Sequence, residues 1–158
     1  MKTRAAILYK INEPLTIQEI EIPKLTAGQV LVKIAYSGVC RTQLNEMQGL
    51  KGEDKFLPHT LGHEASGIVE EVGPQVNKVK AGDHVVATWI QGSGMNVPSV
   101  KYTGDKNKVI NSGAISTFME RAIISENRLV KIPSEMSLRS AALLGCALLQ
   151  GQVLFSIL

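Results

Sequence analysis

The sequence predicts a mainly β domain, built as a small, partly open barrel with short helices and a helix at its C-terminal end. Many short β-rich runs follow one another at close spacing, and turns that contain glycine or proline separate them. These runs do not alternate with long helical patterns, as they would in a parallel α/β sheet. No Gly-x-Gly-x-x-Gly pattern follows a predicted strand, so we expect no dinucleotide-binding (Rossmann) fold in this sequence.

Apolar and β-branched runs in the first part of the chain predict strands at residues 5–9, 15–22 and 29–36. The Asn-Glu-Pro sequence at residues 12–14 predicts the turn between the first two strands. Residues 40–48 contain no β-branched run and precede a glycine, which predicts a short helix.

Two further strands are predicted in the middle of the chain, at residues 62–72 and 84–90, after a loop at residues 52–58. Gly67 lies inside the first of these strands. A glycine within a strand is typical of a bulge or of a tight bend.

The last third of the chain begins with a predicted long loop, since residues 91–113 combine glycine, proline, asparagine and lysine with little periodicity. Strands are predicted at residues 114–124 and 128–132. Ser137 is a suitable N-cap for a helix that starts at Leu138.

Length and composition indicate one globular domain of 158 residues, with 44% hydrophobic and 20% charged residues. The net charge is +3 and no basic run is longer than two residues. Aromatic residues make up only 4% of the chain. A nucleic-acid-binding surface is therefore not expected.

The two cysteines, Cys40 and Cys146, are too few for a disulfide framework. The N-terminal residues become polar too early for a secretory signal, so we expect a cytoplasmic protein. Residues 141–158 carry no charge, and their length alone would permit a membrane anchor. Their glycines and glutamines, with no basic residue after them, favour instead a helix that is buried or covered by a partner.

Four residues are candidates for metal ligation: Cys40, His63, Glu64 and Cys146. Two thiolates with an imidazole suit zinc better than a hard cation. Three protein ligands with one open position are typical of catalytic zinc sites. The four residues form no local finger motif, so their spacing leaves open that the thiols are only buried packing residues.

Five short segments carry a resemblance to a known family: Gly-Val-Cys-Arg-Thr at residues 38–42, Leu-Gly-His-Glu-Ala-Ser-Gly at 61–67, Val-Gly at 72–73, Gly-Asp-His-Val at 82–85 and Leu-Gly-Cys at 144–146. In this order they resemble the N-terminal half of the zinc-dependent, medium-chain alcohol dehydrogenases. The resemblance implies a GroES-like catalytic domain over residues 1–136. It also implies that residues 137–158 form a terminal helix at the start of a cofactor domain.

The resemblance also assigns roles around one catalytic zinc. Cys40, His63 and Cys146 resemble the three protein ligands of this zinc, a Cys₂His set that is typical of alcohol dehydrogenases. Glu64 resembles a neighbouring carboxylate that approaches the metal when the substrate site rearranges, and it is therefore a fourth candidate ligand.

Two neighbours of Cys40 resemble residues that act on substrate and cofactor. Thr42 resembles the hydroxyl that accepts the proton of the alcohol. Arg41 resembles a cationic residue near the pyrophosphate of NAD(P). A solvated surface charge remains the alternative for Arg41.

Three departures from the family pattern bear on this implied function. Gln43 and Asn45 stand where the family often has an aspartate near the metal and a histidine that completes a proton relay. A glutamine lacks the negative charge of that aspartate, which puts zinc affinity in doubt. Residues 91–113 contain no cysteine, so the four-cysteine structural zinc lobe is not expected.

The third departure is that the family continues after its third zinc ligand into a Rossmann domain, whereas this sequence reaches Leu158 without one. We therefore expect a zinc-binding domain of an enzyme that interconverts a small alcohol and an aldehyde or ketone. It is expected to be incomplete and inactive alone, with NAD(P) bound only to a domain supplied elsewhere.

The sequence leaves two alternatives open. One is a non-catalytic GroES-like interaction module or remnant, which associates with a partner or a second copy through its apolar C-terminal helix. The other is a zinc-free reductase of the quinone-reductase type in the same superfamily. The presence of Cys40, His63 and Cys146 argues against this second alternative.

Overall fold

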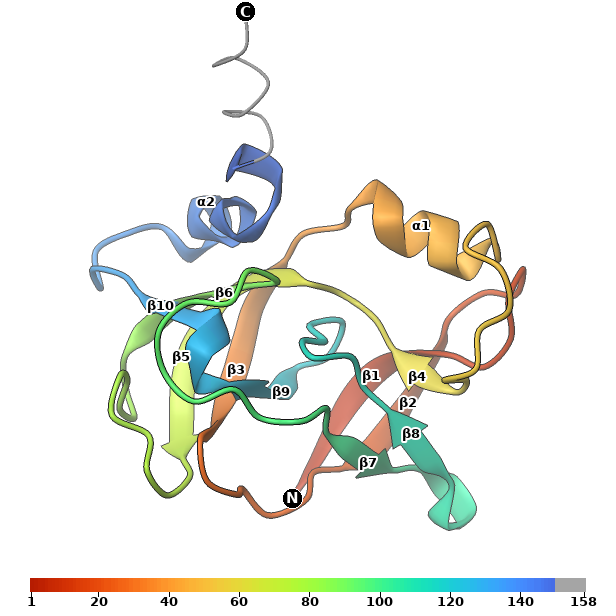
Figure 1. Cartoon of the computed structure of the whole chain (residues 1–158), viewed down its shortest axis with the longest axis horizontal. Helices are drawn as coiled ribbons and strands as arrows, with labels where there is room; N and C mark the ends of the chain where they lie inside the picture. Colours follow the sequence, from red (N-terminus) through yellow and green to blue (C-terminus); the bar gives the residue numbers. More distant parts are fainter. Residues whose placement is uncertain (150–158) are drawn as a thin grey trace, which may run out of the picture.

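Two β-sheets form most of the computed structural model, which describes residues 1–149 (Figure 1). One sheet closes into a five-stranded barrel, whose strands are, in spatial order, β1 (Lys2–Leu8), β2 (Thr16–Glu21), β7 (Lys101–Thr103), β8 (Val109–Asn111) and β4 (His59–Thr60). The other sheet has five strands, in the order β10 (Leu129–Lys131), β6 (His84–Thr88), β5 (Glu64–Val72), β3 (Gln29–Ser37) and β9 (Arg121–Ser125). The predicted mainly β barrel fold is thus confirmed, and the described residues contain no Rossmann fold.

Only short helices accompany the sheets. Within residues 1–149 they include the α-helices α1 (Arg41–Met47) and α2 (Leu138–Ala141) and the 3₁₀ turns η1 (Asp105–Asn107), η2 (Glu126–Arg128) and η3 (Ala142–Gly145). Residues 147–149 are also helical. Helices α1 and α2 both lie at the top of the view in Figure 1, beyond the upper ends of the strands.

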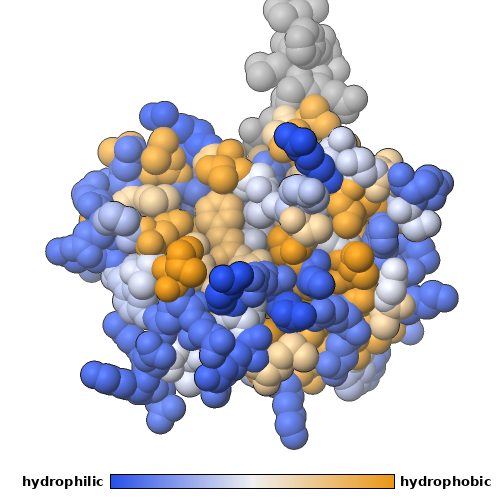
Figure 2. All heavy atoms as spheres, turned by 180° about the vertical axis from the view of Figure 1, so that it is seen from behind, coloured by the Kyte–Doolittle hydropathy of each residue, from blue (hydrophilic) through white to orange (hydrophobic). Residues whose placement is uncertain are grey.

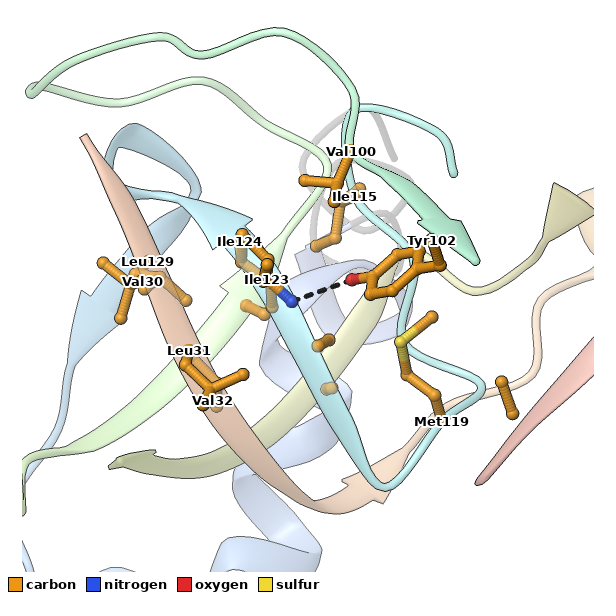
Figure 3. Packing of buried hydrophobic residues seen from close by; sticks show 14 of the residues in the cluster. Val30, Leu31, Val32, Val100, Tyr102, Ile115, Met119, Ile123, Ile124 and Leu129 are labelled. Atoms are coloured by element: carbon orange, nitrogen blue, oxygen red, sulfur yellow. Dashed lines mark hydrogen bonds between the residues drawn. The ribbon is translucent and has the colours of Figure 1, made fainter. Parts of the chain in front are cut away.

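The two sheets share one apolar core (Figure 3). Val30, Val32 and Leu129 are fully buried on the second sheet, and Tyr102 enters the core from β7 of the barrel. The backbone N–H of Ile123 on β9 donates to the Tyr102 hydroxyl at 3.0 Å, which joins the two sheets by a buried hydrogen bond. Burial raises the pKa of Tyr102 to about 12, against a smaller opposing effect of this hydrogen bond.

A bulge is present opposite Gly67, on the neighbouring strand β3. The pairing of β3 with β5 shifts register between Ile34 and Tyr36, which face Gly67 and Ser66. A side chain at Gly67 would overlap the carbonyl oxygen of Lys33 on the neighbouring strand. Glycine is therefore required here for the close approach of the two backbones.

The prediction of a long loop at residues 91–113 is wrong, because this segment contains β7, η1 and β8. Tyr102 and Ile110 are buried and pair with each other, with exposed or half-buried residues on either side. Each strand is only three residues long, so its period-2 pattern is too short to stand out between the polar turn residues.

The strand predicted at residues 114–124 is shorter than expected, since only Arg121–Ser125 forms β9. The residues before it cross from one sheet to the other. The Phe118 N–H donates to Leu61, and the Phe118 carbonyl accepts from Ala6 on β1. Because these backbone groups bond to two different segments, they do not extend the ladder of β9.

The predicted helix from Leu138 begins as expected, and the Ser137 hydroxyl accepts from the Ser140 N–H at 3.5 Å. It is not continuous, however, because α2 passes into the 3₁₀ turn η3 and the backbone leaves helical geometry at Cys146, with φ −153°. The rest of the predicted terminal helix, at residues 150–158, lies outside the described residues. No helix within residues 1–149 is long and apolar enough to cross a membrane.

Glu126 joins two loops, and this supports a first test of the fold. Its Oε1 accepts from the N–H groups of Asn77 and Lys78, both at 2.7 Å, and its Oε2 accepts from the Met95 N–H at 3.0 Å. The residue is only 3% exposed. Burial alone would raise the pKa of this carboxyl, but the three backbone donors outweigh burial and lower its pKa.

We expect Glu126→Gln to lower the free energy of unfolding by about 2 kcal/mol, because the new amide group turns N–H donors toward a backbone N–H. Chemical unfolding at neutral pH measures the change. Since the pKa of Glu126 is lowered, the difference should shrink as the pH falls through that pKa. Glu71→Gln, at an exposed position on β5, is the matched control. Equal losses in both variants would contradict a specific role of the Glu126 carboxylate.

Candidate metal centre

Three residues that are far apart in the sequence come together above the second sheet. Cys40 is the N-cap of α1, His63 immediately precedes β5, and Cys146 follows η3. Their ligand atoms all lie within 4.8 Å of one another. The His63 Nε2 is 3.2 Å from the Cys146 sulfur. The structure thus brings together three of the four residues that the sequence nominated for metal ligation.

Cys146 is positioned by contacts on both sides along the chain. The Thr88 hydroxyl at the end of β6 donates to the Gly145 carbonyl at 2.6 Å. The Ala147 N–H donates to Glu64 Oε2 at 3.1 Å. These two bonds fix the turn that carries the thiol against strands β5 and β6.

Cys40 is positioned by the segment that leads from β3 into α1. The Ser37 hydroxyl and the Gly38 N–H donate to the backbone carbonyl of Glu64 at 3.0 and 3.2 Å. A side chain at Gly38 would overlap the Glu64 carboxylate. Because Gly38 has no side chain, the segment that carries Cys40 can pass directly over Glu64, the residue that follows His63.

Glu64 is buried, with 2% of its surface exposed. Its carboxylate is not a member of the group formed by Cys40, His63 and Cys146, and one of its oxygens holds the Ala147 N–H. In this structure Glu64 thus orders the chain around Cys146.

Gln43 contacts two members of the group, which sequence reasoning did not foresee. Its side chain is 2% exposed. The Cys40 N–H donates to Gln43 Oε1 at 2.9 Å, and Gln43 Nε2 contacts His63 Nδ1. The spacing from Cys40 to Gln43 is that of a capping box, which is the pattern that could have revealed the first of these contacts.

Burial determines the ionisation of the metal-free group. It lowers the pKa of His63, so the imidazole is neutral at pH 7. It also raises the pKa of Cys146 to about 11, with further contributions from the nearby Cys40 and Glu64. The metal-free centre therefore carries a neutral imidazole and a protonated Cys146 thiol at neutral pH.

The donor set fits zinc. Zinc binds thiolate sulfur and imidazole nitrogen at about 2.3 and 2.0 Å in a tetrahedral arrangement, which places ligand atoms roughly 3.5–4 Å apart. The separations here, all within 4.8 Å, require only a small contraction. Three protein donors leave one tetrahedral position open, as in catalytic zinc sites.

The neighbours of Cys40 differ in their surroundings. The Thr42 hydroxyl oxygen lies 3.9 Å from the Cys40 sulfur, and Thr42 lines a cleft. The side chain of Arg41 is exposed, and its Nε donates to Asn45 Oδ1 at 3.2 Å. Thr42 is therefore near the group of three, whereas Arg41 faces solvent.

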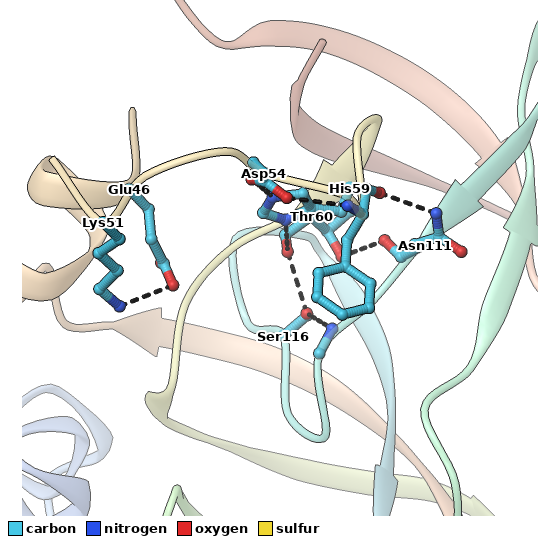
Figure 4. Close-up of polar contacts among 9 residues, drawn as sticks. Glu46, Lys51, Asp54, His59, Thr60, Asn111 and Ser116 are labelled. Carbon is cyan, nitrogen blue, oxygen red and sulfur yellow. Dashed lines mark hydrogen bonds and ion pairs between the residues drawn. The ribbon is translucent and has the colours of Figure 1, made fainter. Parts of the chain in front are cut away.

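The cleft has a volume of about 550 Å³ and is bordered by both Thr42 and His63. Polar pairs order its walls (Figure 4). His59 Nε2 contacts Asp54 Oδ2 at 2.7 Å, and Lys51 pairs with Glu46 at 2.9 Å. Of the group of three, His63 borders this cleft.

The outer surface combines apolar and polar areas. Figure 2 shows apolar patches separated by charged side chains on the face opposite that of Figure 1, with apolar atoms gathered where the described residues end. Four leucines of this last segment are exposed: Leu143, Leu144, Leu148 and Leu149.

Comparison with known proteins identifies the family of this chain. The sequence profile of the family described as "Alcohol dehydrogenase GroES-like domain" matches residues 26–134. The NDMA-dependent alcohol dehydrogenase of Amycolatopsis methanolica is 33% identical over 180 residues, which cover 96% of this chain and 46% of that protein. The S-(hydroxymethyl)glutathione dehydrogenase of Synechocystis sp. is also 33% identical, over 96% of this chain and 47% of its own length.

Among solved structures, the alcohol dehydrogenase zinc-binding domain protein from Burkholderia ambifaria superposes with a TM-score of 0.81 at 27% identity. The superposition covers 92% of this chain and 46% of that one. The chain thus spans about half the length of the relatives that it matches. The fold, the three converging residues and the profile match together show that this chain belongs to the alcohol dehydrogenase GroES-like domain family.

Proposed function

We propose that this chain is the zinc-binding catalytic domain of an alcohol dehydrogenase. Cys40, His63 and Cys146 would hold the zinc, since they supply the only group of three such ligands found among the described residues. Zinc would supply a Lewis acid that polarises the oxygen of an alcohol or carbonyl substrate. The convergence of these three residues is the single observation on which the proposal depends.

The substrate is proposed to be a small alcohol, aldehyde or ketone that enters through the cleft beside His63. Thr42 lines this cleft close to Cys40, which supports the proposal that its hydroxyl accepts a proton from an alcohol and passes it outward. Glu64 is proposed to hold the Cys146 turn and to approach the metal when the site rearranges.

The redox partner is proposed to be NAD(P). The described residues contain no dinucleotide-binding unit, so hydride transfer would require a Rossmann domain supplied elsewhere. Arg41 is exposed beside the candidate centre and is proposed to approach the cofactor pyrophosphate. A reducing, cytoplasmic setting would suit the two free thiols.

Metal analysis of the purified chain tests the proposal. After exposure to zinc and removal of the excess, the chain is expected to hold one zinc, and Cys40→Ser to hold much less, because a hydroxyl is a poor substitute for thiolate. His84→Gln is the matched control, since His84 lies at the other end of β6 from Thr88. Equal zinc in the parent chain and in Cys40→Ser would contradict the proposed centre.

A further inference from the structure

The orientation of the Gln43 amide follows from its contact with Cys40. A backbone N–H can only donate a hydrogen bond, so the atom that faces the Cys40 nitrogen at 2.9 Å must be the carbonyl oxygen of the amide. Gln43 is only 2% exposed. The protein interior therefore determines which way this amide points.

This orientation also determines which nitrogen of His63 carries its proton. With Oε1 directed at Cys40, the amino group of Gln43 faces His63 Nδ1. An amide nitrogen can only donate, so Nδ1 must accept. The single proton of the neutral ring then lies on Nε2, which faces the Cys146 sulfur at 3.2 Å, an acceptor.

A zinc ion between the cysteines requires the opposite arrangement. The ring would bind the metal through Nε2, the nitrogen that faces Cys146, so its proton would have to move to Nδ1. There it would meet the amino group of Gln43, and two donors would face each other. The amide could turn over only by directing its amino group at the Cys40 N–H, which gives up that hydrogen bond.

We propose that Gln43 is a positioning residue that holds the proton of His63 on Nε2 and thereby weakens zinc binding. The inference rests on the proposed function, because it concerns the same zinc site. A carboxylate at position 43 would remove the conflict, since one oxygen accepts from the Cys40 N–H while the other accepts from Nδ1–H. Gln43 is therefore the residue that sets how readily this centre takes up metal.

The proton position is measured without zinc, on the wild-type chain. In a ¹⁵N-labelled, metal-free sample, the imidazole nitrogen shifts and their couplings to ring protons identify the protonated nitrogen of His63. We expect the proton on Nε2. A proton on Nδ1 in the metal-free chain would overturn the proposal, whatever the behaviour of any variant.

The effect on zinc is measured by competition with a chromophoric chelator. Gln43→Glu is expected to bind zinc about 10–100-fold more tightly than the wild-type chain, the usual range for partners of metal-bound histidines. Gln48→Glu adds the same charge just after the other end of α1 and serves as the control for general electrostatic attraction. Equal gains in both variants, or no gain in Gln43→Glu, would overturn the role of Gln43.

A third readout separates positioning from simple structural support. On zinc binding, the Cys40 amide proton should lose its protection from exchange in the wild-type chain and keep it in Gln43→Glu. Unchanged protection in the wild-type chain would contradict the proposed turning of the amide. If no variant binds zinc, the proposed function is wrong, and the tautomer measured in the metal-free chain decides the proton position by itself.

Discussion

The zinc affinity of this domain is expected to rise about tenfold with each pH unit between about pH 7 and about pH 9, or roughly a hundredfold over that range. The cause is the Cys146 thiol, whose pKa is raised to about 11, chiefly by burial. Because zinc binds the thiolate, each binding event must release the Cys146 proton across the whole range.

His63 contributes little to this dependence. Burial lowers its pKa below the ordinary value of 6.5, so the imidazole is already neutral above pH 7 and releases no net proton. The slope above pH 7 thus reports on the Cys146 thiol.

A chelator competition series at fixed ionic strength, corrected for the protonation of the chelator, measures this slope. Cys146→Ser is the informative control, because a serine hydroxyl binds zinc weakly and keeps its proton when it does so. We expect this variant to bind zinc weakly and with a shallower slope. A wild-type affinity that is independent of pH would show that Cys146 is not a zinc ligand in its thiolate form.

Much of the fold could be predicted from local patterns, because long strands carry enough residues for their pattern to be visible. The nine residues of β3 and the nine of β5 lie within or close to the predicted ranges. The bulge opposite Gly67 was signalled for the same reason, since a glycine inside a β-rich run is typical of a bulge or a tight bend. Short elements such as β7, with three residues, contain too few residues to show such a pattern.

The candidate site was nominated by resemblance, since no local pattern connects Cys40, His63 and Cys146. Their approach depends on long-range contacts, such as the bond from Ala147 to Glu64, which no periodicity encodes. Gln43 shows most clearly what could not be predicted from the sequence alone. The sequence identified a missing negative charge, but the simultaneous contacts to Cys40 and His63 exist only in the folded chain.

The interruption of the terminal helix has a physical origin that also makes it testable. Gly145 packs so closely on the second sheet that a side chain there would overlap the Ala87 carbonyl oxygen and lie 2.8 Å from Glu64 Cβ. Helical propensity therefore yields to tertiary packing at this position. The packing places Cys146 beside His63.

We expect Gly145→Ala to lower the free energy of unfolding by about 3 kcal/mol, because the added methyl group meets backbone that has no space to move. The same displacement should carry Cys146 away from His63 and weaken zinc binding by about 10–100-fold. Chemical unfolding and chelator competition measure the two effects separately, so weaker zinc binding in a folded variant can be told from loss of fold.

Gly92→Ala is the matched control for both measurements. Its added methyl group would come no closer than 3.4 Å to the Asn127 carbonyl oxygen, which is ordinary contact. The same chemical change thus occurs at a glycine without crowding, and we expect it to leave stability within about 0.5 kcal/mol and zinc affinity unchanged. If Gly145→Ala behaves like Gly92→Ala, the close contact of Gly145 with β6 does not hold Cys146 in place, and the turn must be held by the hydrogen bonds from Thr88 and to Glu64.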